Sequence, residues 1–325
     1  MSKQPLIDQL DMVIGRIIAD REIQLESLAS MDTAIVELLD LARDLRDLPA
    51  PEFKERLRAD LERKISMSKK SVVFREGFRT LTPYLLPPNE GYLDFLKNVF
   101  DAVQTERTDT GPGRFHAEMR IGDSMLMLGV GSERRMPVML QIWVPNVDKV
   151  CQRAIAAGSR SLVEVTEGYG ERFGVVEDPG ENQWVISTHL DDQTFSIPTQ
   201  TLMMWFHPRG AAKFIDFIKR AFNATEVQRH DSPDGRVNYA QMRIGDSVIA
   251  LNEPSERWMP MQSMVYLYVP DVDALYAQAL RAGAKSLSEP KDQFYGDRSA
   301  GVQDEWGNMW YIATPLLSSV SESKT

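Results

Sequence analysis

The chain has 325 residues, of which 43% are hydrophobic and 26% are charged, a composition typical of a globular protein with a substantial core. Its formal net charge of −10 argues against nucleic acid as a partner, because such a surface needs a concentrated basic face. The single cysteine, Cys151, excludes an internal disulfide and a cysteine-based zinc site.

Residues 1–77 are predicted to form a helical N-terminal region. Apolar residues recur at helical spacing over 7–17 and 35–45, and Pro51 suits the first turn of a third helix. The apolar stripes need a packing partner, which is the rest of the chain, a second copy in a homodimer, or another protein. Charges throughout the amino terminus, and no run of about 18 apolar residues, predict a cytoplasmic protein without a membrane partner.

The region 78–192 has the pattern βαβββ twice. An extended segment (TLTPYLL) precedes an amphipathic helix (YLDFLKNVF), and short strands end in RIGDSMLML. The Gly-Asp pair between two alternating apolar runs predicts a tight hairpin. The pattern restarts with the strand VMLQIWVPN and the helix VDKVCQRAIAAG, and it ends in NQWVISTHL.

The region 198–316 repeats this pattern. FHAEMRIGDSMLML recurs as NYAQMRIGDSVIAL, and WVPNVDKVCQRAIAAGSRSL recurs as YVPDVDALYAQALRAGAKSL. Matches in the same order over so long a stretch indicate two homologous domains, 78–192 and 198–316. Residues 317–325 are expected to be a disordered tail.

The series TPYL, LDFLKNVFDA, HAEMRIGDSMLML, VPNVDKVCQRAIAAG and YGERFGVVEDPGENQWVIST resembles the PhnB-like branch of the glyoxalase/bleomycin-resistance (vicinal oxygen chelate, VOC) superfamily. The resemblance leaves out the first 77 residues. It implies an α+β fold of tandem domains, each with two βαβββ units that form a cupped mixed sheet. Whether strands pair within one domain or between the domains is not decided by the sequence.

The resemblance also implies where a metal would bind. Enzymes of the superfamily hold a divalent ion with four side chains inside the cup, typically histidine or glutamate. The aligned positions here are Leu81, Met127, Met139 and Val185, then Met203, Ala250, Met264 and Tyr311. Thioethers and aliphatic groups do not hold a hard divalent ion, so we expect neither a metal nor another cofactor.

Aromatic and polar residues on the same strands suggest a ligand site instead. Strand alternation places Met139, Gln141 and Trp143 on one face, and Met264, Tyr266 and Tyr268 likewise. Such walls suit a flat apolar ligand, although they could also fill a closed core. The candidate ligand-binding residues are Gln141, Trp143, Tyr169, Arg172, Trp205, Tyr239, Gln241, Tyr266, Tyr268, Arg298 and Tyr311.

His116 and Glu118 are the candidate catalytic residues. Two positions apart on a strand, they share a face and suit an acid–base pair, or they are a hydrogen-bonded pair without chemistry. In YGER (169–172) and YGDR (295–298) the arginine is expected to pair with a nearby carboxylate, or to clamp an anionic ligand. His207, in HPRG, is expected to be exposed in a loop.

These observations predict a metal-independent protein that binds a small molecule, an apolar or aromatic metabolite or antibiotic. One alternative is a lyase, isomerase or cyclase of the same fold, acting on a secondary metabolite through acid–base side chains. Another is a partner-binding protein acting through residues 1–77. The sequence does not decide whether the chain catalyses a reaction.

Overall fold

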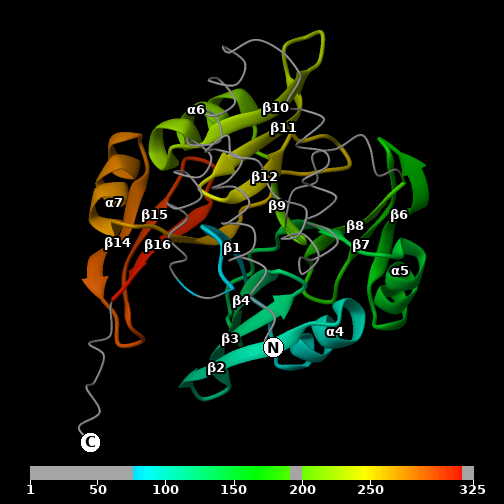
Figure 1. Cartoon of the computed structure of the whole chain (residues 1–325), viewed down its shortest axis with the longest axis horizontal. Coiled ribbons are helices and arrows are strands. Elements are labelled where there is room, and N and C mark those ends of the chain that lie inside the picture. The colour runs from blue at the N-terminus through cyan, green and yellow to red at the C-terminus, as the bar shows by residue number, and fades with distance from the viewer. Residues whose placement is uncertain (1–74, 76, 191–199, 317–325) are drawn as a thin grey trace, which may run out of the picture. The chain divides into compact units, whose positions relative to one another are not determined.

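The computed structural model describes residues 75, 77–190 and 200–316, which form four βαβββ units (Figure 1). The first repeat contains β1 (Leu81–Leu85), α4 (Gly91–Phe100), β2 (Val103–Gly111), β3 (Arg114–Ile121) and β4 (Ser124–Val130), then β5 (Met139–Trp143), α5 (Val147–Ala156), β6 (Arg160–Gly168), β7 (Glu171–Glu177) and β8 (Gln183–His189). The second contains β9 (Leu202–Phe206), α6 (Ala211–Phe222), β10 (Thr225–Asp231), β11 (Val237–Ile244) and β12 (Ser247–Leu251), then β13 (Met264–Tyr268), α7 (Val272–Arg281), β14 (Lys285–Asp292), β15 (Asp297–Gln303) and β16 (Met309–Pro315).

Two predictions fall on other parts of the chain. The helices expected before residue 75, including the one starting at Pro51, lie outside the described residues, as does the tail 317–325. None of the described helices is long and apolar enough to cross a membrane.

Strands pair between the two repeats, which the sequence had left open. Sheet A has the order β14-β15-β16-β13-β1-β4-β3-β2 and joins the fourth unit to the first. Sheet B has the order β10-β11-β12-β9-β5-β8-β7-β6 and joins the third unit to the second. At the centre of each sheet the first strands of two units run antiparallel, β1 with β13 and β5 with β9. The predicted α+β class of paired βαβββ units in mixed sheets is confirmed, with each sheet drawing one unit from each repeat.

Local signals in the sequence account for the helix starts and the hairpins. Asn146 and Asp271 cap α5 and α7, and each side chain accepts a backbone N–H of the first turn at 2.9 Å. The Gly-Asp pairs form the predicted two-residue hairpins β3–β4 and β11–β12. Gly122 and Gly245 have φ angles of +57° and +59° there, a conformation that glycine adopts without a steric penalty.

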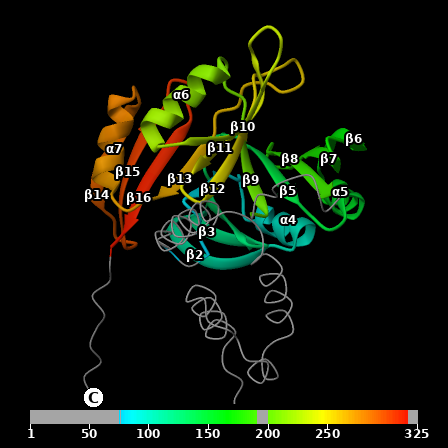
Figure 2. The ribbon, with the colours of Figure 1, turned by 45° about the horizontal axis from the view of Figure 1, so that its top comes forward.

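Within each repeat, helices hold the two units together. Phe100 at the end of α4 packs on Trp184 of β8, with ring centroids 4.3 Å apart, and Phe222 of α6 packs on Trp310 of β16 at 4.4 Å. Helix α4 contacts α5, and α6 lies beside α7 (Figure 2). One apolar core therefore covers a single face of each sheet, and the opposite face carries none of the described helices.

The repeated Gly-Asp-Ser turns join sheet A to sheet B in a contact that we call the GDS clasp. Asp246 Oδ1 accepts the backbone N–H of Thr80 at 2.7 Å, and Ser247 Oγ accepts that of Leu81 at 2.9 Å. The turn between β11 and β12 of sheet B thus caps β1 of sheet A.

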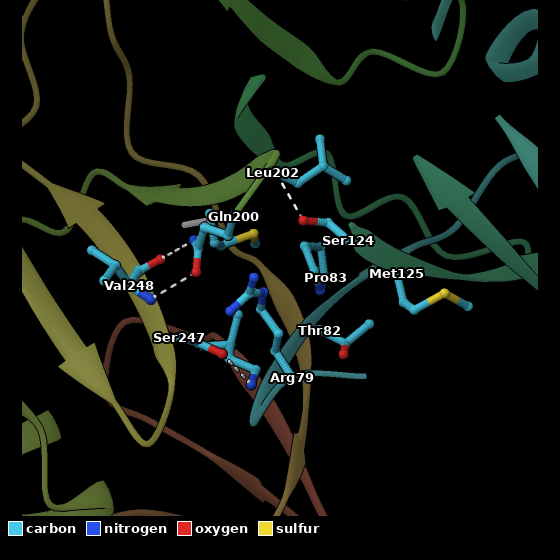
Figure 3. Close-up of a pocket in the computed structure, with 11 residues that line it drawn as sticks. Arg79, Thr82, Pro83, Ser124, Met125, Gln200, Leu202, Ser247 and Val248 are labelled. Atoms are coloured by element: carbon cyan, nitrogen blue, oxygen red, sulfur yellow. Dashed lines mark hydrogen bonds between the residues drawn. The ribbon is translucent and has the colours of Figure 1, made fainter. Parts of the chain in front are cut away.

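The other half of the GDS clasp is the equivalent contact in the opposite direction, from the Gly-Asp-Ser turn of the first repeat to the start of β9. Asp123 Oδ1 accepts the N–H of Thr201 at 2.6 Å, and Ser124 Oγ accepts that of Leu202 at 3.1 Å. Figure 3 shows this second bond and the two bonds between Gln200 and the backbone of Val248. The cavity between these residues has a volume of about 10 Å³, room for about one water, so it is part of a structural joint.

Candidate functional site

Each sheet has a face that the described helices leave uncovered. Along β5, Leu140 and Ile142 enter the apolar core, so Met139, Gln141 and Trp143 point to the opposite side. We call this side face B, and the corresponding side of sheet A face A. Face A carries Tyr84, His116, Glu118, Met127, Met264, Tyr266, Tyr268, Met309 and Tyr311. Face B carries Met139, Gln141, Trp143, Glu171, Val185, His189, Met203, Trp205, Tyr239, Gln241 and Ala250.

The positions aligned with metal ligands do not supply a donor set. Leu81 lies in the apolar core. The other seven reach the two faces as Met127, Met264 and Tyr311 on face A, and Met139, Val185, Met203 and Ala250 on face B. The phenol of Tyr311 is the single oxygen among these seven side chains. Within residues 77–190 and 200–316, no three His, Cys, Asp or Glu side chains are grouped as a metal site requires. The side chains at the eight aligned positions therefore do not fit a divalent metal.

The structure places His116 and Glu118 together on face A. Their side chains approach to 3.5 Å, and Tyr84 Oη lies 3.2 Å from His116 Nδ1. Glu118 is 3% exposed and forms an ion pair with Arg75. Burial raises the pKa of Tyr84, so this phenol stays neutral.

A second acid on face A, Asp297, was missed by the sequence analysis. Its carboxylate accepts hydrogen bonds from Tyr266 at 3.0 Å and Tyr268 at 3.3 Å. Arg75 donates to the Tyr268 hydroxyl at 3.2 Å, which connects Asp297 to the ion pair of Arg75 and Glu118. Burial raises the pKa of Asp297. Face A thus holds a connected network of acids, phenols and one arginine.

Face B carries an acid among aromatic groups. Glu171, also missed, accepts from the Trp143 indole at 2.8 Å and from the Gln141 amide at 3.1 Å. His189 Nδ1 lies 3.4 Å from the same carboxylate, and the His189 and Trp143 rings stack at 5.9 Å.

The predicted residues Trp205, Tyr239 and Gln241 lie on face B as well. The Trp205 and Tyr239 rings are 5.7 Å apart, and Gln241 donates to the Tyr239 hydroxyl at 2.8 Å. His207, expected to be exposed, is instead 2% exposed and stacked on Trp205. Its strand β9 ends one residue earlier, so the ring stays within the fold, and burial lowers its pKa to about 4.

In the YGER and YGDR motifs, the arginine and the acid before it point to opposite sides of the strand. Arg172 holds Asp148, in the first turn of α5, through two hydrogen bonds of 2.9 and 2.7 Å. Arg298 holds Asp273 of α7 in the same way. Both arginines are thus engaged in fastening a helix to a strand, and Tyr169 is 91% exposed in the turn. The preceding acids, Glu171 and Asp297, point to faces B and A because neighbouring residues of a strand alternate.

Comparison with known proteins gives matches to the sequence and to the fold. A family model described as Glyoxalase/Bleomycin resistance protein/Dioxygenase superfamily matches residues 209–312. An uncharacterized protein of Mycobacterium bovis is 35% identical over 117 residues, which cover 33% of this chain and 77% of that protein. Glyoxalase I from Zea mays has a TM-score of 0.55 at 14% identity, covering 72% of this chain and 92% of its own. A putative dioxygenase from Bacillus subtilis has a TM-score of 0.51 at 14% identity, covering 72% and 84%. At such identities the solved structures share the fold alone.

Proposed function

The chain belongs to the glyoxalase/bleomycin resistance protein/dioxygenase superfamily, and from this premise we propose that it binds a small apolar or aromatic molecule without a metal. The proposal places it in the PhnB-like branch, on the strength of HAEMRIGDSMLML and its repeat. This proposal rests on the side chains that occupy the seven aligned metal-ligand positions on faces A and B. These positions hold methionines, valine, alanine and one tyrosine in place of imidazole and carboxylate.

The lining of face B supports a ligand of this kind. Trp143, Trp205 and Tyr239 are half-buried, so their rings are neither packed away in the core nor fully in water. Flat rings stack on such walls, and the polar groups of Gln141 and Gln241 can orient them. Methionine side chains adapt to the remaining shape.

The test uses N-phenyl-1-naphthylamine, a neutral fluorescent aromatic compound. Its binding is titrated before and after dialysis against EDTA, beside elemental analysis of the native protein. We expect saturable binding that EDTA leaves unchanged and that Trp205→Ala weakens. Trp306→Ala is the matched control, because Trp306 packs against the helix-covered core. Binding that is lost with EDTA and restored by a divalent ion would refute the metal-independent proposal.

A second candidate function, an acid–base enzyme without a metal, is favoured by the network on face A. His116 lies within reach of both Tyr84 and Glu118, and Asp297 has a raised pKa beside two phenols. For a compound that binds, the expected result is turnover that His116→Ala abolishes while binding remains. Release of the unchanged compound by the wild-type protein rules against this candidate.

A further inference from the structure

Faces A and B carry an acid at the same place in different surroundings, and this difference leads to an inference that rests on the proposed function. Asp297 and Glu171 occupy equivalent positions in YGDR and YGER. The side chains that donate hydrogen bonds to these two acids also occupy equivalent positions in the two repeats. Two phenols donate hydrogen bonds to Asp297, whereas an amide and an indole donate to Glu171.

Face A supplies its own positive charge. Arg75 pairs with Glu118 and donates to the Tyr268 hydroxyl, which donates to Asp297. Arg75 lies in the segment that precedes β1. The segment that precedes β9 in the second repeat, residues 191–199, contains neither lysine nor arginine.

Among the described residues, face B has no comparable charge beside its acid. The Glu171 side chain is 18% exposed, and in the described part of the chain no lysine or arginine pairs with it. A partly buried carboxylate that no lysine or arginine neutralises can attract a cationic ligand. Among those residues, the ion-pair contact of Glu171 is with His189, at 3.4 Å.

The environment of His189 adds a second acceptor. His189 Nδ1 is the ring nitrogen that lies near Glu171, and when the neutral imidazole carries its proton there, Nε2 is an acceptor. This Nε2 atom is buried and has no hydrogen-bond partner within the described residues. A ligand with an N–H group would satisfy it.

Aromatic rings complete the site. Trp143 donates to the carboxylate of Glu171, and it packs with Trp205 and Tyr239 on a small apolar floor. The faces of such rings attract cations, and most strongly where water is excluded. We infer that face B binds an organic ammonium ion. Glu171 provides the counter-charge, the three rings form the walls, and His189 Nε2 accepts an ammonium N–H.

The experiment compares benzylamine, protonated at neutral pH, with benzyl alcohol, its neutral analogue of similar size. Each is titrated into the wild-type full-length protein, Glu171→Gln and Glu226→Gln, with tryptophan fluorescence and calorimetry as readouts. Glu226 is the matched control because it lies in the same sheet and pairs with Lys219 of α6 at 3.1 Å. We expect the wild type to bind benzylamine about tenfold more tightly than benzyl alcohol. Glu171→Gln removes this preference without weakening benzyl alcohol binding, and Glu226→Gln keeps it.

The outcomes separate this inference from the proposed function. Equal affinity for the two benzyl compounds, or binding of N-phenyl-1-naphthylamine alone, overturns the ammonium inference and leaves the proposed function standing. Failure of all three compounds overturns both. An equal loss of preference in Glu171→Gln and Glu226→Gln overturns the assignment to Glu171. If Glu171→Gln does not fold, the preference of the wild-type protein for benzylamine over benzyl alcohol tests the ammonium inference by itself.

Discussion

The GDS clasp predicts that the glycine in its turn cannot be replaced, and Gly245→Ala tests this. A Cβ atom added at Gly245 would lie 2.1 Å from Oγ1, 2.7 Å from Cβ and 2.8 Å from Cγ2 of Thr80. Because all three side-chain atoms of Thr80 are too close, no rotation of that side chain relieves the overlap. The backbone of β1 or of the turn must move, which disturbs the bonds of Asp246 and Ser247 to β1.

The expected loss of unfolding free energy in Gly245→Ala has two contributions, which a control variant can separate. The left-handed φ of +59° costs alanine about 1 kcal/mol, net of the entropy it removes from the unfolded chain. Overpacking against Thr80 adds about 1–3 kcal/mol. Gly235 has a φ of +81° and would meet no atom within 4 Å, so Gly235→Ala carries the first contribution alone. Equilibrium urea unfolding, followed by circular dichroism, measures both variants. Equal losses of unfolding free energy in Gly235→Ala and Gly245→Ala would refute the close approach to Thr80.

The remaining predictions concern the core and one buried histidine. Phe222→Ala should lower the unfolding free energy by about 3–5 kcal/mol, because it removes the ring that packs on Trp310. Val227→Ala, at a side chain 41% exposed, should change it by no more than about 0.5 kcal/mol, and comparable losses would contradict the packing argument. Burial lowers the pKa of His207 from 6.5 to about 4, so the folded state favours the neutral ring. The unfolded chain therefore binds the proton first, and stability should fall by up to about 3 kcal/mol as the pH drops from 6.5 to 4. His207→Gln should flatten that part of the stability profile, and an unchanged profile would contradict the assignment.

The elements of the fold were predictable from the sequence because local rules determine them. Alternating apolar residues, the cap residues Asn146 and Asp271, and the Gly-Asp hairpins all act within a few residues of chain. The pairing of strands was not predictable in this way. All four units carry the same alternation, which determines the buried side of a strand but not its neighbour. The choice depends on contacts between distant residues, such as Thr80 with Asp246.

The candidate sites show the same limit. The sequence identified Gln141, Trp143 and Tyr239, and the structure places all three on face B. It singled out the arginines of YGER and YGDR and overlooked the acids beside them. Strand alternation already assigns the two residues to opposite sides, but it does not say which side the helices cover. That choice follows from the tertiary packing of α5 and α7, whose aspartates the arginines hold.

The divergence of the two repeats follows from these constraints. The GDS clasp and the Phe–Trp contacts are equivalent in both repeats, because they hold the four units together. The groups that donate hydrogen bonds to Asp297 and Glu171 differ, and Arg75 is connected to Asp297 but not to Glu171. An ammonium ion on face A would have to compete with Arg75, whereas on face B it would meet an acid without a lysine or arginine partner among the described residues. Calorimetry should therefore give one benzylamine per chain, and Arg75→Gln should raise the number toward two. Two equivalent sites in the wild-type protein would show that Arg75 does not neutralise face A.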